Sequence, residues 1–259
     1  MTENEWKEIC DDVNNQMIRH VRPYITPLFK SSIQPRSLVG SGSFIRTGKT
    51  QSILTCEHVI RGKEMDFILS ENQTPYSIGH SLASYPEPID LELASIKPGN
   101  WLNVVHNSKS ICESQISRRH APYCKEEILF IQGFAFENSG LGHGDEIPIS
   151  TGLATQQKST GSSDEKIFEL FWEPNKMNYS SETDEQTQNI HRHIDPRGIS
   201  GSLVWDTKFL ECTAQKINWS PAYSTVTGIV QRWDSTTASL ICLRSEWLLP
   251  LLSNAGEKN

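Results

Sequence analysis

The stretch "DPRGISGSLVW", residues 195–205, sets a serine between two glycines immediately before an apolar run. Glycines at 198 and 201 permit backbone conformations that side chains resist, so the chain can turn sharply around Ser200. The apolar residues that follow favour a buried strand. One interpretation is a tight turn into that strand. The other is a serine held on a sharp loop, with its oxygen exposed and neighbouring backbone N–H groups directed at one point.

After residue 37 the chain is rich in short runs that favour strands. "IDLELASIK" (89–97) alternates apolar and polar residues, and "ILFIQGFAF" (128–136) is rich in apolar and aromatic residues. Turn residues separate about a dozen such runs. This rhythm predicts a mostly-β fold, and the 259 residues are enough for two β-barrels.

Helices are expected at the two ends of this β region. Apolar residues recur at helical spacing over residues 3–22, and the prolines of "RPYITP" (22–27) end the pattern. The closing segment "SEWLLPLLSN" (245–254) is also predicted to be helical. The expected organisation is an N-terminal helix and linker (1–34), a first barrel (35–114), and a second barrel with a C-terminal helix (115–259).

Composition excludes several classes of partner. The net charge is −7 and no block of lysine and arginine occurs, so nucleic acid is not an expected partner. No apolar run reaches the length of a membrane span, so no membrane partner is expected. The charged N-terminal stretch does not read as a secretory signal, and the six cysteines form no CxxC pair. These features predict free thiols and a cytoplasmic location.

Two further contexts change the interpretation of Ser200. "ILTCEHVI" (53–60) puts His58 directly after a strand, and "IDLELASIK" puts Asp90 at the start of one. In this order, His58, Asp90 and Ser200 resemble the triad of the trypsin-like (chymotrypsin-fold) serine peptidases, of the bacterial intracellular type. The resemblance covers about residues 38–250. It implies two six-stranded antiparallel β-barrels, with His58 and Asp90 in the first and Ser200 in the second.

The chemistry of each residue type agrees with this resemblance. A serine hydroxyl is a poor nucleophile until a base takes its proton, and the imidazole of His58 is such a base. Asp90 would fix the ring tautomer and stabilise the imidazolium. The resemblance assigns the oxyanion hole to the backbone N–H groups of Gly198 and Ser200. It implies a serine endopeptidase that hydrolyses protein or peptide substrates through an acyl-enzyme, with no cofactor and no metal.

Other interpretations of these residues remain open at this point. Taken singly, a histidine after a strand, an aspartate at a strand start and a serine in a glycine turn are common structural features. Asp66 in "EMDFILS" (64–70) also precedes an apolar run and competes with Asp90 for the third position. The alternative function is a catalytically silent module of the same fold that binds peptides or partner proteins. A third is hydrolysis of small esters.

Substrate-binding residues are expected in two places. "TVTGIVQRW" (225–233) is similar to the strand that lines the cleft in this family, so Gly228, Ile229 and Val230 are expected to pair with a peptide backbone. Ile194 is expected near the floor of the specificity pocket, which favours an apolar or small substrate side chain. A shift of one residue puts Asp195 there and reverses the preference toward arginine or lysine.

The sequence also departs from the family pattern. Secreted zymogens place an aspartate before the serine, where this chain has Ile199. Activation through that ion pair is therefore not expected. Together with the acidic loop "NYSSETDEQTQN" (178–189), this favours control by a regulatory partner, as in protease effectors of bacterial stress or anti-phage systems. His191 and His193 lie in a polar stretch with no third ligand at a suitable spacing, so they do not predict a metal site.

Overall fold

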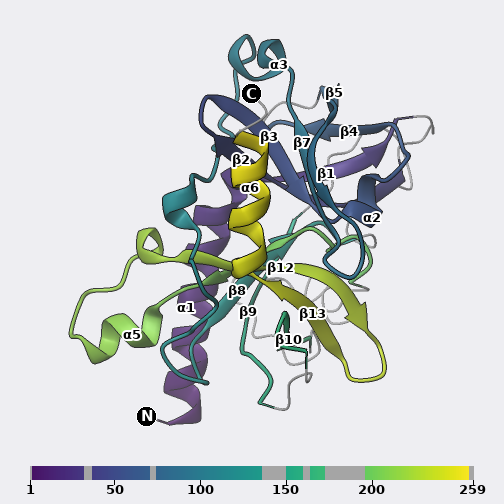
Figure 1. Cartoon of the computed structure of the whole chain (residues 1–259). Coiled ribbons are helices and arrows are strands. Elements are labelled where there is room, and N and C mark those ends of the chain that lie inside the picture. Colours follow the sequence, from purple (N-terminus) through teal and green to yellow (C-terminus); the bar gives the residue numbers. More distant parts are fainter. Residues whose placement is uncertain are drawn as a thin grey trace.

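The computed structural model describes residues 2–31, 37–70, 74–135, 150–159, 164–172 and 196–256. Within these ranges the chain forms two curled antiparallel β-sheets, one above the other in Figure 1, with a helix near each terminus. The expected fold class, mostly β with an N-terminal and a C-terminal helix, is confirmed. In the described part of the chain, no helix is both long enough and apolar enough to span a bilayer.

The first sheet has seven strands in the order β5-β4-β1-β2-β3-β7-β6, one more than the six expected. Its strands are β1 (Ile25–Lys30), β2 (Ser37–Thr47), β3 (Thr50–Thr55), β4 (Met65–Ile68), β5 (Pro75–Ser77), β6 (Ser81–Tyr85) and β7 (Leu91–Ser95). Strand β1 lies where a linker was expected. Pro27 was expected only to end the helix, yet β1 pairs with β2 on one edge and β4 on the other, and Leu28 and Phe29 are buried.

The second sheet has six strands in the order β10-β13-β12-β11-β8-β9. Its strands are β8 (Leu129–Gly133), β9 (Thr151–Thr155), β10 (Ile167–Phe171), β11 (Leu203–Asp206), β12 (Thr225–Asp234) and β13 (Ser239–Arg244). Strand β11, the apolar run that follows Ser200, is completely buried between β8 and β12. The sequence expectation of a strand directly after the serine turn is therefore confirmed.

Helices lie at the ends of the chain and in short connections. They are α1 (Glu3–Val21), α2 (Glu57–Ile60), α3 (Pro98–Leu102), α5 (Phe209–Ala214) and α6 (Leu248–Gly256), with 3₁₀ turns at Arg22–Tyr24, Glu113–Gln115, Pro221–Tyr223 and Ser245–Trp247. A capping box formed by Thr2 and Glu5 begins α1. Both terminal helices were expected, with bounds close to those observed.

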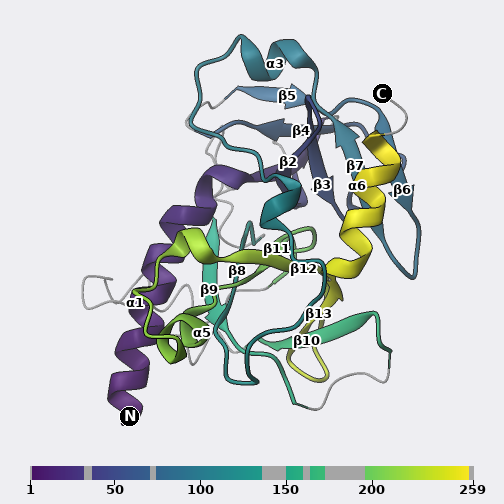
Figure 2. The same cartoon turned by 60° about the vertical axis from the view of Figure 1, so that its left-hand side comes forward.

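Each terminal helix packs on the sheet that is distant from it in sequence. Helix α1 runs along the second sheet (Figure 2), where Asn14 Oδ1 accepts a hydrogen bond of 2.9 Å from the N–H of Ala154 in β9. Helix α6 packs on β6 and β7 of the first sheet, where Asn254 Nδ2 donates to the Tyr85 hydroxyl at 2.7 Å. The two helices therefore bind the halves of the fold to each other.

A buried histidine joins the segment between the two sheets to the second sheet. His120 is 4% exposed, and its ring stacks on Phe168 with centroids 3.8 Å apart. Its Nδ1 is 2.8 Å from Thr227 Oγ1 and its Nε2 is 3.1 Å from Gln157 Oε1. The neutral ring satisfies both contacts, with Nε2–H donating to Gln157 and Nδ1 accepting from the Thr227 hydroxyl. Burial lowers the pKa of His120 from 6.5 to about 4.

We expect this histidine to make folding sensitive to acid. Because its pKa is lower in the folded chain than in the unfolded chain, stability is full above pH 6.5 and falls as the pH drops toward 4. At pH 4 the free energy of unfolding is lower by about 3 kcal/mol, since each unit of pKa shift is worth about 1.4 kcal/mol. Urea unfolding of the wild type and His120→Gln at pH 7 and pH 4.5 measures it. Equal pH dependence in the two proteins would contradict the assignment.

Candidate active site

His58 is placed by the end of a strand in the first sheet. Strand β3 ends at Thr55, and α2 begins two residues later with Cys56 as its N-cap, so His58 lies in the first turn of α2. Lys63 Nζ donates to the carbonyl of His58 at 2.8 Å. The His58 side chain is 42% exposed, which leaves part of the ring open to solvent.

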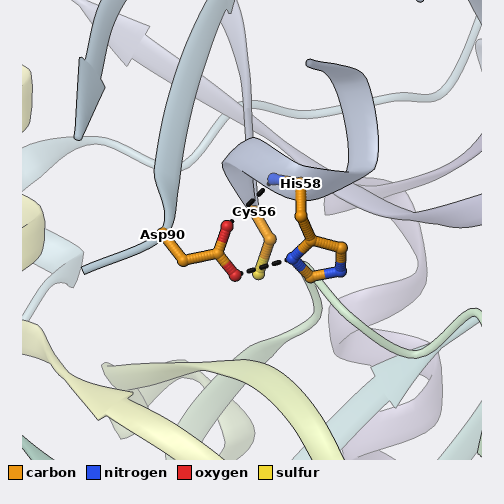
Figure 3. A group of neighbouring side chains, drawn as sticks. All are labelled: Cys56, His58 and Asp90. Carbon is orange, nitrogen blue, oxygen red and sulfur yellow. Dashed lines mark hydrogen bonds and ion pairs between the residues drawn. The ribbon is translucent and has the colours of Figure 1, made fainter. Parts of the chain in front are cut away.

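Asp90 binds the histidine through both carboxylate oxygens. Oδ2 lies 2.6 Å from His58 Nδ1, and Oδ1 accepts a 2.9 Å hydrogen bond from the His58 backbone N–H (Figure 3). Asp90 is buried and has a φ of 53°, held by a turn in which its N–H donates to the Pro86 carbonyl. With Nδ1–H directed at the carboxylate, His58 Nε2 is left as a proton acceptor.

Asp66, the competing carboxylate, lies elsewhere in the first sheet. It is in β4, opposite Phe29 of β1 and Ser77 of β5, and its Oδ1 accepts from the Ser77 hydroxyl at 3.0 Å. In the sheet order β4 is separated from β3 by β1 and β2, whereas β7, which follows Asp90, is the direct neighbour of β3. The geometry therefore pairs His58 with Asp90.

Ser200 lies in a turn that leads into β11, and two backbone N–H groups of this turn have no acceptor among the described residues. The N–H of Ile199 donates to the Pro196 carbonyl at 3.0 Å, and Gly198 has a φ of 93°, which is typical of a type II turn. The N–H groups of Gly201 and Ser202 also donate to backbone carbonyls. Among the described residues, the N–H groups at 198 and 200 meet no acceptor. These are the two donors that the sequence analysis assigned to the oxyanion hole.

Ser41 of β2 holds the serine turn against the first sheet. Its N–H donates to the Ser200 carbonyl at 2.9 Å, and its hydroxyl donates to the Gly198 carbonyl at 2.8 Å. The same hydroxyl accepts from the N–H of Phe134, and the Ser41 carbonyl accepts from the Thr55 hydroxyl at 2.8 Å. Sequence reasoning missed Ser41. The signal was the run of small residues "GSGS" at 40–43, which permits close approach of another backbone.

Cys56 also lies between the two halves of the site. Its Sγ donates to the Val230 carbonyl of β12 at 3.3 Å and lies within 4.8 Å of the ligand atoms of His58 and Asp90. The thiol is fully buried, and burial together with the charge of Asp90 raises its pKa well above the usual range. Cys56 therefore stays a neutral thiol beside the histidine–aspartate pair. Sequence reasoning treated it only as a core residue.

The Ser200 turn packs against the end of β3, two residues before α2 begins. A Cβ at Gly201 would lie 2.4 Å from Thr55 Oγ1 at the end of β3, and His58 follows three residues later in α2. In the part of the chain described, no hydrogen bond joins the Ser200 hydroxyl to the His58 ring. Catalytic hydrogen bonds are often long or misaligned without substrate.

The predicted peptide-pairing residues of β12 have no free backbone edge. Gly228 and Ile229 pair with β11 on one side and β13 on the other. The N–H and carbonyl of Val230 bond to Ser202 and Gly201, so strand addition at all three residues is excluded. From residue 232 to 234, β12 pairs only with β13 among the described strands. Trp233 in this segment is 39% exposed, and sequence reasoning did not single the segment out.

Several predicted features lie outside the described residues. They are the specificity-pocket positions Ile194 and Asp195, the histidines His191 and His193, and the acidic loop 178–189.

Comparison with known proteins identifies the fold. No family model matches the chain, and no curated protein matches its sequence. A serine endoprotease from Yersinia pestis is similar in structure, with a TM-score of 0.58 and 15% identity over 94% of this chain and 66% of that one. The Rv3671c protease of M. tuberculosis matches in its active form (TM-score 0.53, 14% identity, 94% and 86% covered). A serine-to-alanine mutant of Rv3671c in its inactive form also matches, with a TM-score of 0.53 and 12% identity over 95% of this chain and 93% of that one.

These likenesses, together with the two curled sheets, show that the chain has the trypsin-like serine peptidase fold. The chain spans about two thirds of the Yersinia structure.

We expect Gly201→Ala to destabilise the fold strongly. Its φ is 90°, and an added Cβ would lie 2.1 Å from the Ser41 carbonyl oxygen, so strain and overlap combine to about 2–5 kcal/mol. Gly62→Ala is the matched control, because Gly62 has a φ of 62° but open space around it, and strain alone costs about 1–2 kcal/mol. Urea unfolding compares the two. Equal losses would show that the serine turn is not tightly packed against β2.

Proposed function

We propose that this chain is a serine endopeptidase that acts through Ser200, His58 and Asp90. The observation that carries the proposal is the 2.6 Å contact between His58 Nδ1 and Asp90, on the sheet that faces the Ser200 turn and its two amides without acceptors. The fold shared with solved serine proteases supports it.

The proposed reaction follows from these positions. Ser200 Oγ attacks the carbonyl carbon of the scissile peptide bond while His58 Nε2 takes its proton, and Asp90 stabilises the imidazolium. The N–H groups of Gly198 and Ser200 bind the oxyanion, each worth about 10²–10³ in rate. His58 then gives its proton to the leaving amine, which leaves an acyl-enzyme on Ser200. Water, with His58 as base, hydrolyses that ester.

The substrate backbone is proposed to add along residues 232–234 of β12. This edge continues directly from Val230, whose carbonyl accepts from the Gly201 N–H, so it leads to the Ser200 turn. Gln231 strengthens the junction, because its Nε2 donates to the carbonyl of Ile89 at 2.7 Å. A peptide on this edge gains main-chain hydrogen bonds irrespective of its sequence.

The first test is labelling of the purified protein by a fluorophosphonate probe. We expect labelling of the wild type and none of Ser200→Ala, which lacks the nucleophile. His58→Ala lacks the base, and Asp90→Asn should lower the rate by about 10⁴-fold, as in a comparable peptidase. Asp66→Asn is the matched control and should label like the wild type. Labelling that survives in Ser200→Ala would overturn the assignment of the nucleophile.

The alternative is a silent module that binds peptides without cleaving them. The observation in its favour is that no hydrogen bond links the Ser200 hydroxyl to the His58 ring in the described chain. Wild-type protein that binds peptides but is not labelled, alone or with candidate partners, would favour this alternative over the peptidase.

We expect Trp233→Ala to separate recognition of long substrates from chemistry. Loss of a large aromatic surface beside the peptide edge should lower kcat/KM for extended peptides by about tenfold, equivalent to about 1.4 kcal/mol. The rate of labelling by a small fluorophosphonate should not change, because that probe does not reach the edge. Trp219→Ala serves as the control, since Trp219 packs on Phe209 of α5. If Trp233→Ala leaves peptide hydrolysis unchanged, the substrate does not use this edge.

The proposal includes control by a partner protein. Ile199 is 1% exposed, so the residue before the serine is an apolar anchor and offers no carboxylate for an activating ion pair. A cytoplasmic location and a role as an effector in a bacterial stress or anti-phage system stay predictions. Labelling rates measured with and without candidate partners test the control.

A further inference from the structure

Three side chains at the candidate active site are of types that bind metal ions and lie close together. The thiol of Cys56, the imidazole of His58 and the carboxylate of Asp90 place their ligand atoms within 4.8 Å of one another. Figure 3 shows the thiol beside the contact between the ring and the carboxylate. Two ligand atoms on one tetrahedral zinc ion lie about 3.3–3.8 Å apart, given bonds of about 2.0–2.3 Å. His58 Nδ1 and Asp90 Oδ2 are 2.6 Å apart, so they would separate to reach that spacing and their hydrogen bond would break.

The chemistry of the set is selective. A thiolate, an imidazole and one carboxylate suit zinc and other thiophilic divalent ions, and do not suit calcium or magnesium, which prefer oxygen ligands. Three protein ligands leave one coordination position open. Two of the ligands are buried, and the partly exposed His58 ring gives the ion a route from solvent.

We propose that this site binds zinc or a similar thiophilic divalent ion, and that the ion switches off the peptidase. The inhibition rests on the proposed function, whereas the binding does not.

The mechanism of inhibition follows from the ring tautomer. Coordination of the ion displaces the proton of the Cys56 thiol to solvent, so that the sulfur binds as a thiolate. His58 binds through Nδ1, so the proton of the neutral ring moves from Nδ1 to Nε2. An Nε2 that carries a proton accepts none from Ser200, and Asp90 now binds the ion instead of orienting the ring. The ion therefore competes with the geometry that catalysis requires.

Cobalt(II) tests the binding directly, because zinc itself has no useful spectrum. We expect wild-type protein titrated with cobalt(II) to develop a thiolate-to-cobalt charge-transfer band. Cys212→Ala removes a buried thiol on α5 that lies outside the set, and should behave like the wild type. Cys56→Ala should lose the band and bind more than about 100-fold more weakly, since even partners that only orient a ligand contribute about 10–100-fold.

Cys56→Ser is the second variant, in case the alanine variant does not fold. It keeps the size of the side chain and lacks the soft ligand, so it should also lose the band. Circular dichroism shows whether each variant is folded. A wild type with no charge-transfer band, or a folded Cys56 variant that keeps it, overturns the site.

Labelling by the fluorophosphonate tests the inhibition. Micromolar zinc should suppress labelling of the wild type and of Cys212→Ala, and excess chelator should restore it. For Cys56→Ala, the zinc concentration that halves labelling, measured against its own metal-free rate, should be at least tenfold higher than for the wild type. Equal sensitivity of all three overturns the proposed inhibition. Wild type that binds cobalt but is never labelled contradicts the peptidase and leaves the metal site standing.

Discussion

The structure depends on a close contact between two backbones, that of the Ser200 turn and that of β2. Ser41 makes hydrogen bonds to the carbonyls on both sides of Ile199, and there is no room for a side chain on Gly201, whose Cβ would lie 2.1 Å from the Ser41 carbonyl oxygen. A side chain on Gly40 of β2 would also crowd the serine turn, since its Cβ would lie 3.2 Å from the Ser200 carbonyl oxygen. Small residues on both segments let the two sheets meet at hydrogen-bond distance.

The candidate site is a product of this junction. The first sheet supplies the histidine–aspartate pair, and the second supplies the serine and the two amides without acceptors. Besides Ser41, two more side chains among the described residues bond across the junction: Cys56 reaches the carbonyl of Val230, and Gln231 reaches the carbonyl of Ile89 beside Asp90. The terminal helices α1 and α6 each cross to the other half of the fold. A site divided between two sheets keeps its geometry only if the sheets cannot slide, and these contacts oppose sliding.

Patterns along the sequence predicted much of this arrangement. The features that were missed all depend on contacts between residues that lie far apart in the sequence. The strand rhythm, both terminal helices and the strand after Ser200 were predicted from local residue patterns. Strand β1 was missed because the prolines of residues 22–27 indicated only where the helix ends, whereas pairing on two edges makes residues 25–30 a strand. The open edge of β12 was expected at residues 228–230, whereas residues 232–234 pair only with β13 among the described strands, because the open edge depends on where β11 begins. Ser41 and Cys56 were missed because their partners lie far away in the sequence.

What the sequence determined by itself is local. Gly198 and Gly201 adopt positive φ values that only glycine adopts readily, so a sharp turn at Ser200 follows from residues 198–201 alone. The capping box and apolar spacing of α1 act over a few residues in the same way. Only the tertiary structure decided which carboxylate meets His58. Strands β3 and β7 are antiparallel neighbours, so the residues that follow β3 meet the residue that precedes β7, which is Asp90. Asp66 has a similar sequence context, but its strand pairs elsewhere, and strand pairing depends on the packing of the whole sheet.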